Sequence, residues 1–134
     1  MIPSGNAALN ADLEVVVMPS KQHAMNLYGT RIFGICDDLV AIEQTVFKIL
    51  STERYKYIIY SWNYGIELAD LFGQSTIYVC PEIERRVKEA LLQDDRITDV
   101  DNFEFEFPRR GTVSTKFTVH TIFGDLDEEL AVNI

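Results

Sequence analysis

Apolar residues between positions 38 and 51 recur every three or four residues, the spacing that places them on one side of a helix. We expect this helix to begin after Asp37 or Asp38, because either carboxylate accepts hydrogen bonds from the free N–H groups of a first turn. It should end near Ser51 and Thr52. The predicted buried stripe consists of Leu39, Ile42, Val46, Ile49 and Leu50, widened by Phe47.

A second helical pattern starts at Pro81, which fits the first position of a helix because the N–H at that position has no helical partner. Two pairs of opposite charge lie four residues apart in the favourable order, Glu82 with Arg86 and Glu84 with Lys88. Each such pair stabilises a helix by roughly 0.3 kcal/mol. The predicted buried stripe consists of Ile83, Val87, Ala90 and Leu91.

Alternation of apolar and acidic residues predicts a β-strand at 103–107, where phenylalanines alternate with Glu104 and Glu106. Residues 108–111 form the expected turn, and 113–123 the return strand. A register with Glu104 opposite Lys116 pairs opposite charges and keeps the apolar face continuous, whereas a slip by one residue spoils both. The same register pairs Phe107 with Val113, Phe105 with Thr115 and Phe103 with Phe117.

Shorter elements are expected elsewhere. Short β-prone segments occur at 14–18, 24–28 and 31–35. Residues 55–62, rich in aromatic and β-branched side chains, should form a strand or an extended segment. Their Trp62 and tyrosines either pack against the fold or form an aromatic binding face. Residues 66–72 should form a short helix that Gly73 ends in the left-handed conformation.

These elements predict an α+β fold, with helices packed on one face of a small antiparallel sheet that has a C-terminal β-hairpin. We expect one domain over residues 13–124, between a flexible N-terminus at 1–12 and an acidic C-terminal tail at 125–134. The long return strand is expected to lie at an open edge. Another chain would then pair with it near Val119 by strand addition.

The chain has 134 residues with 12 basic and 21 acidic side chains, a formal net charge of −9. A surface this acidic argues against nucleic acid and anionic membranes as partners, because both attract clustered Lys and Arg. The apolar runs are shorter than the about 18 residues of a membrane span. The N-terminus lacks the pattern of a signal peptide, so we expect synthesis in the cytoplasm.

No pattern of residues points to catalysis. The chain contains no serine-nucleophile elbow, nucleotide-binding loop or zinc-protease motif. Cys36 and Cys80 belong to no metal-binding pair, and no nucleophile accompanies His120 in the sequence. We therefore predict a protein that is not an enzyme, has no metal, cofactor or small-molecule substrate, and acts by binding proteins. An acidic adaptor or inhibitor that masks a basic protein is the alternative function.

Two segments, in the right order, resemble the baseplate wedge proteins of contractile tails, a family also described as sheath initiators or as lysozyme-like. The first is Ile-Leu-Ser-Thr-Glu-Arg at 49–54, followed by Trp-Asn-Tyr-Gly at 62–65. The second is Ala-Leu-Leu-Gln-Asp-Asp-Arg-Ile at 90–97. Three stretches resemble the XkdS-like subgroup from prophages related to PBSX, namely 52–70, 90–107 and the hairpin end at 118–124.

The resemblance spans residues 31–124 and implies a structural subunit of the baseplate. Members of this family clasp a helical bundle made by two wedge proteins and offer a β-element that the first sheath ring joins. The implied partners are therefore baseplate wedge proteins and the tail sheath protein. The resemblance also implies synthesis in the host cytoplasm and incorporation into the tail baseplate of a phage or phage-like particle.

The family pattern has Gly-Glu-Arg in the first segment and Glu-Pro-Arg in the second. Here no glycine precedes Glu53, and Asp94-Asp95-Arg96 replaces the second triplet without its rigid proline. An acid and an arginine remain in both, and arginine binds carboxylates through two parallel hydrogen bonds. The expected partner-binding cluster at the helix ends consists of Glu53, Arg54, Asp94 and Arg96. The alternative is that these side chains form a clasp within the fold.

Overall fold

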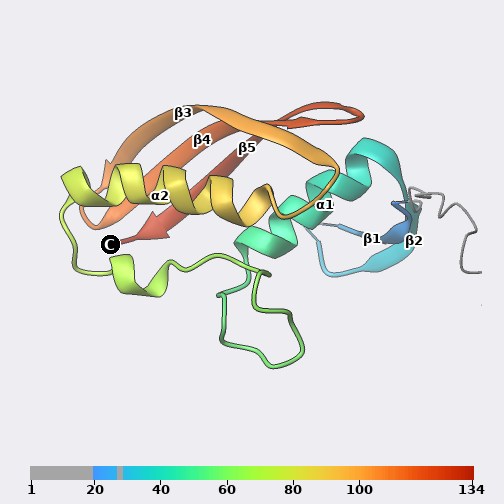
Figure 1. Ribbon diagram of the computed structural model, residues 1–134, viewed down its shortest axis with the longest axis horizontal. Helices are drawn as coiled ribbons and strands as arrows, with labels where there is room; N and C mark the ends of the chain where they lie inside the picture. Colours follow the sequence, from blue (N-terminus) through green and yellow to red (C-terminus); the bar gives the residue numbers. More distant parts are fainter. Residues whose placement is uncertain (1–19, 27–28) are drawn as a thin grey trace, which may run out of the picture.

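The computed structural model describes residues 20–26 and 29–134. The strand expected at 14–18 and the flexible segment expected at 1–12 lie outside this part of the chain. Two α-helices and two antiparallel sheets make up the described residues (Figure 1). The elements are β1 (Gln22–Met25), β2 (Ile32–Cys36), α1 (Asp38–Leu50), the 3-10 helix η2 (Ala69–Leu71), α2 (Thr76–Leu91), β3 (Ile97–Arg109), β4 (Thr112–Thr121) and β5 (Gly124–Asn133).

The larger sheet has the order β3-β4-β5, and α1 and α2 pack against one of its faces (Figure 1). The inward-facing strand residues and the apolar stripes of both helices form one core. Its fully buried members include Ile42, Val46, Ile83, Val87, Leu91, Val100, Val113 and Val119. The predicted α+β class, with helices on one face of an antiparallel sheet, is confirmed.

The predicted register of β3 and β4 is confirmed at its centre. Glu104 lies opposite Lys116 and Phe105 opposite Thr115. The rings of Phe103 and Phe117 stack with centroids 5.3 Å apart. Bulges on either side of this segment shift the register, so the alternation holds for only part of the strand.

The C-terminal residues form a third strand rather than a tail. β5 pairs with β4 along its whole length without a shift in register. Leu126, Leu130 and Val132 point towards the core, while acidic residues occupy most of the intervening positions. The expectation of a separate acidic tail at 125–134 is therefore wrong. The segment is rich in acidic residues, but its buried and exposed positions alternate as is typical of a strand with one buried face.

The third strand changes which edges of the sheet are open. β4 lies between β3 and β5, and Val119 is 0% exposed. The prediction that the strand carrying Val119 offers an open edge is wrong, because neighbours on both sides use its hydrogen-bonding groups. Within the described residues, the open edges of this sheet belong to β3 and β5.

α1 begins and ends where the sequence predicts. The Asp37 carboxylate accepts a hydrogen bond from the N–H of Asp38 at 2.8 Å, and Ser51 is the C-cap. The buried Gln44 amide of this helix donates to the carbonyl of His23 at 2.8 Å and accepts from the N–H of residue 25 at 2.7 Å. One polar side chain therefore attaches the β1–β2 hairpin to α1.

α2 begins at Thr76, so the prediction of a start at Pro81 is wrong. Pro81 lies inside the helix, where its missing N–H removes one hydrogen bond. The affected carbonyl belongs to Ile77, on an exposed turn that water can reach. Both predicted ion pairs of this helix form, with N···O distances of 3.0 and 2.9 Å.

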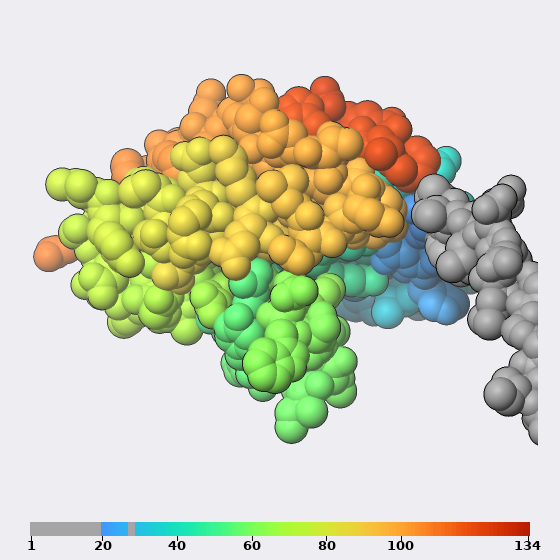
Figure 2. Space-filling model, in the orientation of Figure 1, coloured from blue at the N-terminus to red at the C-terminus, as the bar shows by residue number. Residues whose placement is uncertain are grey.

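Residues 55–62 do not form the expected strand. They belong to the connection between α1 and η2, which projects from the body of the molecule (Figure 2). Turns occupy this segment, and Tyr55 has a positive φ of 64°. The short helix expected at 66–72 shrinks to η2, although Gly73 has the predicted left-handed conformation with φ of 82°.

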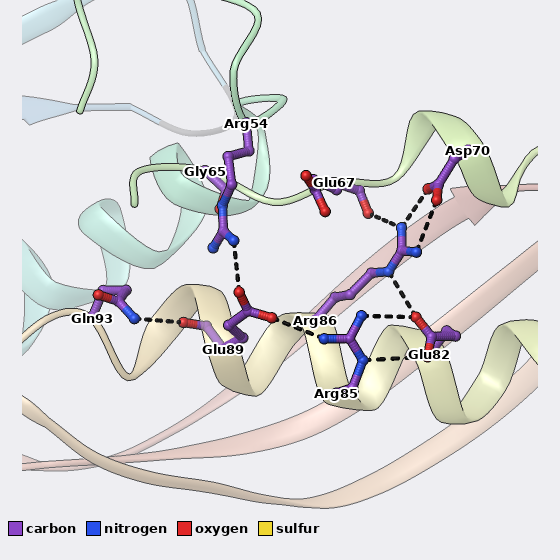
Figure 3. Close-up of polar contacts among 9 residues, drawn as sticks. All are labelled: Arg54, Gly65, Glu67, Asp70, Glu82, Arg85, Arg86, Glu89 and Gln93. Carbon is purple, nitrogen blue, oxygen red and sulfur yellow. Dashed lines mark hydrogen bonds and ion pairs between the residues drawn. The ribbon is translucent and has the colours of Figure 1, made fainter. Parts of the chain in front are cut away.

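Arg86 fastens this connection to α2. Its guanidinium donates to both carboxylate oxygens of Asp70, to the carboxylate of Glu82 and to the backbone carbonyl of Glu67 (Figure 3). The Arg86 side chain is only 8% exposed. Its hydrogen bonds hold the pKa of the Asp70 carboxyl below the usual range. One arginine thus fixes η2 against the first half of α2.

One carboxylate of β5 faces α1 from the core side of the sheet. Glu128 lies on the same side of the strand as Leu126 and Leu130 and is partly buried. Burial and the nearby charge of Glu43 on α1 raise the pKa of Glu128 to about 7. Ionised Glu128 therefore opposes the packing of α1 on β5.

Replacing Arg86 by methionine should destabilise the fold by about 2 kcal/mol, because the change removes four charge-assisted hydrogen bonds and leaves the partly buried carbonyl of Glu67 unpaired. Chemical denaturation measures the effect. Arg85→Met is the matched control, since Arg85 forms ion pairs on the same helix with a side chain that is 55% exposed. The control should change stability by less than about 0.5 kcal/mol. Equal losses in both variants would contradict the assignment.

Glu128→Gln should stabilise the protein by about 1 kcal/mol near pH 8, because solvent screens part of the penalty on the partly buried carboxylate. A raised pKa favours folding at low pH, and this contribution is lost as pH rises through about 7. The advantage of the amide should therefore fade towards pH 4.5. Denaturation of this variant and of Glu129→Gln, on the exposed face, compares the two pH values. A gain independent of pH would refute the prediction.

Candidate functional site

An aromatic loop, residues 55–62, is the first candidate surface. Exposed fractions reach 103% for Ile58, 85% for Ile59 and 83% for Trp62. Figure 2 shows the surrounding segment as a narrow projection from the body of the molecule. The sequence has no Asp or Glu between Arg54 and Ile66, although the whole chain is strongly acidic. Large apolar side chains gathered on one projection are typical of a protein-binding surface.

The base of the aromatic loop is closed by main-chain hydrogen bonds. The N–H of Ile66 donates to the carbonyl of Thr52 at 2.9 Å, and the N–H of Arg54 donates to the carbonyl of Ile66 at 3.1 Å. Gly65 has a positive φ of 95°, and a Cβ there would lie 2.5 Å from the Thr52 carbonyl oxygen. Both the conformation and the lack of space require glycine. The loop is therefore closed where the sequence has its aromatic-glycine turn.

Two of the predicted site residues, Glu53 and Arg54, hold the base of the aromatic loop in place. The carboxylate of Glu53 accepts from the N–H groups of residues 68 and 69 at 3.2–3.3 Å. Arg54 donates to the carboxylate of Glu89 on α2 at 2.8 Å and to the carbonyl of Gly65 at 3.2 Å (Figure 3). The hydrogen bond from Arg54 holds the pKa of Glu89 below its usual range. Glu53 and Arg54 thus fix the base of the aromatic loop to the rest of the fold.

Contacts within the aromatic loop hold its rings in place. The ring of Tyr60 stacks on that of Tyr64 at a centroid distance of 4.5 Å, and Tyr57 meets Tyr60 edge to face at 6.3 Å. The backbone forms two turns here. The N–H of Tyr60 donates to the carbonyl of Tyr57, and the N–H of Tyr64 donates to the carbonyl of Ser61. The loop is therefore partly preorganised, which lowers the entropy lost when it binds a partner.

The other two predicted site residues form a separate pair. The guanidinium of Arg96 donates to the two carboxylate oxygens of Asp94 at 2.8 and 2.6 Å. These bonds hold the pKa of Asp94 below its usual range. Arg54 pairs with Glu89 instead, so the four predicted residues form two clasps rather than one cluster. Both clasps lie within the fold and stiffen the ends of the helices.

A small hollow connects the aromatic loop with the Asp94–Arg96 pair. Its volume is about 270 Å³. Its lining comes from α1, from residues 61–64 at the end of the aromatic loop and from the end of α2 with the residues that follow it. The lining residues are Thr45, Ile49, Ser61, Asn63, Tyr64, Ala90, Gln93 and Asp94. The aromatic loop and Asp94 therefore border one side of the molecule, and a single partner can contact both.

The outer face of the larger sheet, opposite the helices, is the second candidate surface. Side chains of β4 form hydrogen bonds to acids of both neighbouring strands: Ser114 to Glu129, Lys116 to Glu106, Thr118 to Asp127, and His120 to Asp125 and Asp101. The hydrogen bonds to Asp125 and Asp101 raise the pKa of His120. Lys116 is the only lysine or arginine in this set, so the face carries excess negative charge.

The free edge of β5 can be located by counting along its ladder. The N–H of Ile134 donates to the carbonyl of Gly111 at 2.8 Å. Hydrogen-bonded pairs alternate with non-hydrogen-bonded pairs in an antiparallel ladder, and the register of β4 and β5 is unbroken. Even-numbered residues of β5 therefore bond to β4. The odd-numbered residues Asp125, Asp127, Glu129, Ala131 and Asn133 direct their N–H and C=O groups away from the sheet.

The described residues offer little support for other kinds of site. None of their helices has the length and apolarity needed to cross a bilayer. In the same part of the chain, no three His, Cys, Asp or Glu side chains gather in a way that suits a metal ion. Burial raises the pKa of the Cys80 thiol, which makes it a poor nucleophile. The two surfaces described above are suited to binding proteins.

Comparison with known proteins shows the family of this chain. The family model described as "Contractile injection system sheath initiator" matches residues 20–124. The "Phage-like element PBSX protein XkdS" of Bacillus subtilis (strain 168) is 38% identical over 125 residues, which cover 88% of each chain. The resemblance noted from the sequence is thus confirmed, and a structural role in a contractile tail follows from it. The chain belongs to the contractile injection system sheath initiator family.

Proposed function

We propose that this protein joins the wedge proteins of a tail baseplate to the first ring of the sheath. In this proposal the edge of β5 receives a β-strand from the sheath protein. The side that carries the aromatic loop and the Asp94–Arg96 pair faces the wedge proteins. The protein is made in the host cytoplasm and then incorporated into the tail of a phage or phage-like particle.

The observation that carries the proposal is the open edge of β5. Five residues of this strand direct free main-chain groups outward, and no described segment pairs with them. An added strand forms main-chain hydrogen bonds with such an edge whatever the side chains are. A sheath initiator requires a surface that starts a repeating assembly, and an edge strand provides a template for the next strand.

The wedge-facing side is supported by the composition and order of the aromatic loop. Tyrosine, tryptophan and arginine are the residues most often responsible for binding energy in protein interfaces. Glu53 and Arg54 hold the base of the loop, so they contribute by positioning it. The Asp94–Arg96 pair borders the same hollow and offers oriented polar groups at the rim.

The two surfaces lie apart in the molecule, which suits a connecting role. In Figure 1 the segment that contains the aromatic loop extends from the side of the helices away from the larger sheet. β5 belongs to that sheet, so the helical layer separates the two surfaces. A partner on the loop therefore leaves the β5 edge accessible to another chain.

Ala131→Pro should abolish sheath assembly, because it removes an outward N–H from the edge of β5 while keeping the bonds to β4. Expression of the tail genes with this variant, followed by electron microscopy, should show at least about tenfold fewer baseplates carrying sheath. Ala131→Thr retains the N–H and is the matched control. Both variants should keep the far-ultraviolet circular dichroism of the original. Normal sheath assembly with a folded Ala131→Pro variant would refute the role of this edge.

Ile58→Ser should weaken capture of purified wedge proteins by at least about tenfold, because Ile58 is the most exposed apolar side chain of the aromatic loop. Ile77→Ser is the control, since Ile77 is 88% exposed on α2, outside this loop. Neither change should alter the melting temperature, because neither side chain belongs to the core. Equal capture of both variants would exclude the aromatic loop as the wedge-binding surface.

A further inference from the structure

The side chains on the open edge of β5 define the chemistry of the strand that can join it. Asp125, Asp127 and Glu129 lie at alternate positions and point to the outer face of the sheet. The same three residues direct their main-chain groups outward. An added strand therefore places every second side chain directly beside one of these carboxylates, at Cβ distances of about 5 Å.

These carboxylates have hydrogen-bond partners on β4, and that of Asp125 is Nδ1 of His120 at 2.7 Å, an imidazole whose pKa the neighbouring carboxylates raise. Thr118 donates to Asp127 and Ser114 to Glu129, and both donors are neutral hydroxyls. Lys116 lies opposite Glu129 on the neighbouring strand, but it forms its ion pair with Glu106 of β3, at 2.8 Å. Within the described residues, the negative charges of Asp127 and Glu129 are therefore not neutralised by a direct ion pair. A neighbouring acid would be repelled, whereas a neighbouring lysine or arginine would be attracted.

The inner face of β5 favours different side chains in the added strand. Leu126, Leu130 and Val132 border the core on this side, so apolar residues of an added strand extend the core. A hollow of about 820 Å³ borders the strand, and its lining combines Glu43 and Phe47 of α1 with outer-face residues such as Lys116 and Asp127. The inner and outer faces together describe a partner strand with alternating apolar and basic positions.

Glu128, on the inner face of β5, also favours a basic side chain in the added strand. Its carboxyl faces Glu43, and within the described residues neither acid has a cation as partner. On β4, the residue opposite Glu128 is Phe117, which has no charge. The raised pKa of Glu128 agrees with this lack of a compensating charge. A basic side chain at the edge of the hollow would stabilise the ionised form of the pair.

We infer that the segment that adds to β5 is a basic strand in which lysine or arginine alternates with apolar residues. The inference rests on the proposed strand addition at this edge and specifies the chemistry of the partner. It stands on three features together: the free main-chain groups, the alternation of acids with apolar residues, and the lack of a direct ion pair at Asp127 and Glu129 within the described residues.

Synthetic peptides test the inference on the full chain. A peptide of alternating Lys and Val, labelled with a fluorophore, should bind with an affinity that falls as salt is added. A peptide of alternating Thr and Val should bind at least about tenfold more weakly, because it keeps the strand propensity and loses the charge. Equal binding of the two peptides would overturn the inference.

Matched variants separate strand addition from general attraction to an acidic protein. The β5 triple variant Asp125→Asn, Asp127→Asn and Glu129→Gln should weaken binding of the Lys-Val peptide by at least about fivefold. The β3 triple variant Asp101→Asn, Glu104→Gln and Glu106→Gln changes the net charge equally and should change affinity less than about twofold. Circular dichroism should confirm that both variants fold. Equal effects of the two triples would overturn the inference.

Failure of the inference and failure of the proposed function have different signatures. If Ala131→Pro blocks sheath assembly but the β5 triple neither weakens peptide binding nor impairs assembly, strand addition stands and the basic partner is refuted. If Ala131→Pro permits normal assembly, the proposed role of the edge fails, whatever the peptides do. Loss of Lys-Val binding in both Ala131→Pro and the β5 triple supports the inference, since both changes act on the same edge.

Discussion

Burial of the apolar stripe of α2 against one face of the β3-β4-β5 sheet is the interaction on which the rest of the structure depends. Val87 and Ile83 of the helix and Val119 of the central strand are fully buried in the shared core. This contact decides which side of every strand faces water, because side chains alternate between the two faces. The exposed acids of β5 and the position of its free edge follow directly from it.

The same helix also organises the opposite side of the molecule. Arg86 fastens η2 to α2, and the carboxylate of Glu89 accepts a hydrogen bond from Arg54 at the base of the aromatic loop (Figure 3). Exposed apolar side chains are thus placed on a short, braced projection rather than on a mobile segment. A rigid core therefore supports two different binding surfaces, one made of side chains and the other of main-chain groups. That division suits a family whose role in contractile tails is structural.

Local patterns predicted the parts of the fold that depend on neighbouring residues. The periodicity of α1, its Asp37 cap and the pairing of Glu104 with Lys116 are all present. Two of the predictions that were wrong, the strand at 55–62 and the single cluster of site residues, depend on distant partners. The aromatic segment has strand-forming residues but no neighbouring strand. Arg54 bonds to Glu89 across 35 positions of the sequence, a contact that no local spacing indicates.

By itself, the sequence determined the α+β class, the family resemblance and the acidic charge, because these follow from residue type and short-range periodicity. The tertiary structure decided that residues 125–133 form a strand and that Val119 lies in the middle of the sheet. It also divided Glu53, Arg54, Asp94 and Arg96 between two clasps. The physical reason is that hydrogen bonds between strands and contacts between helix ends join residues far apart in the chain, and their geometry exists only after the core has formed.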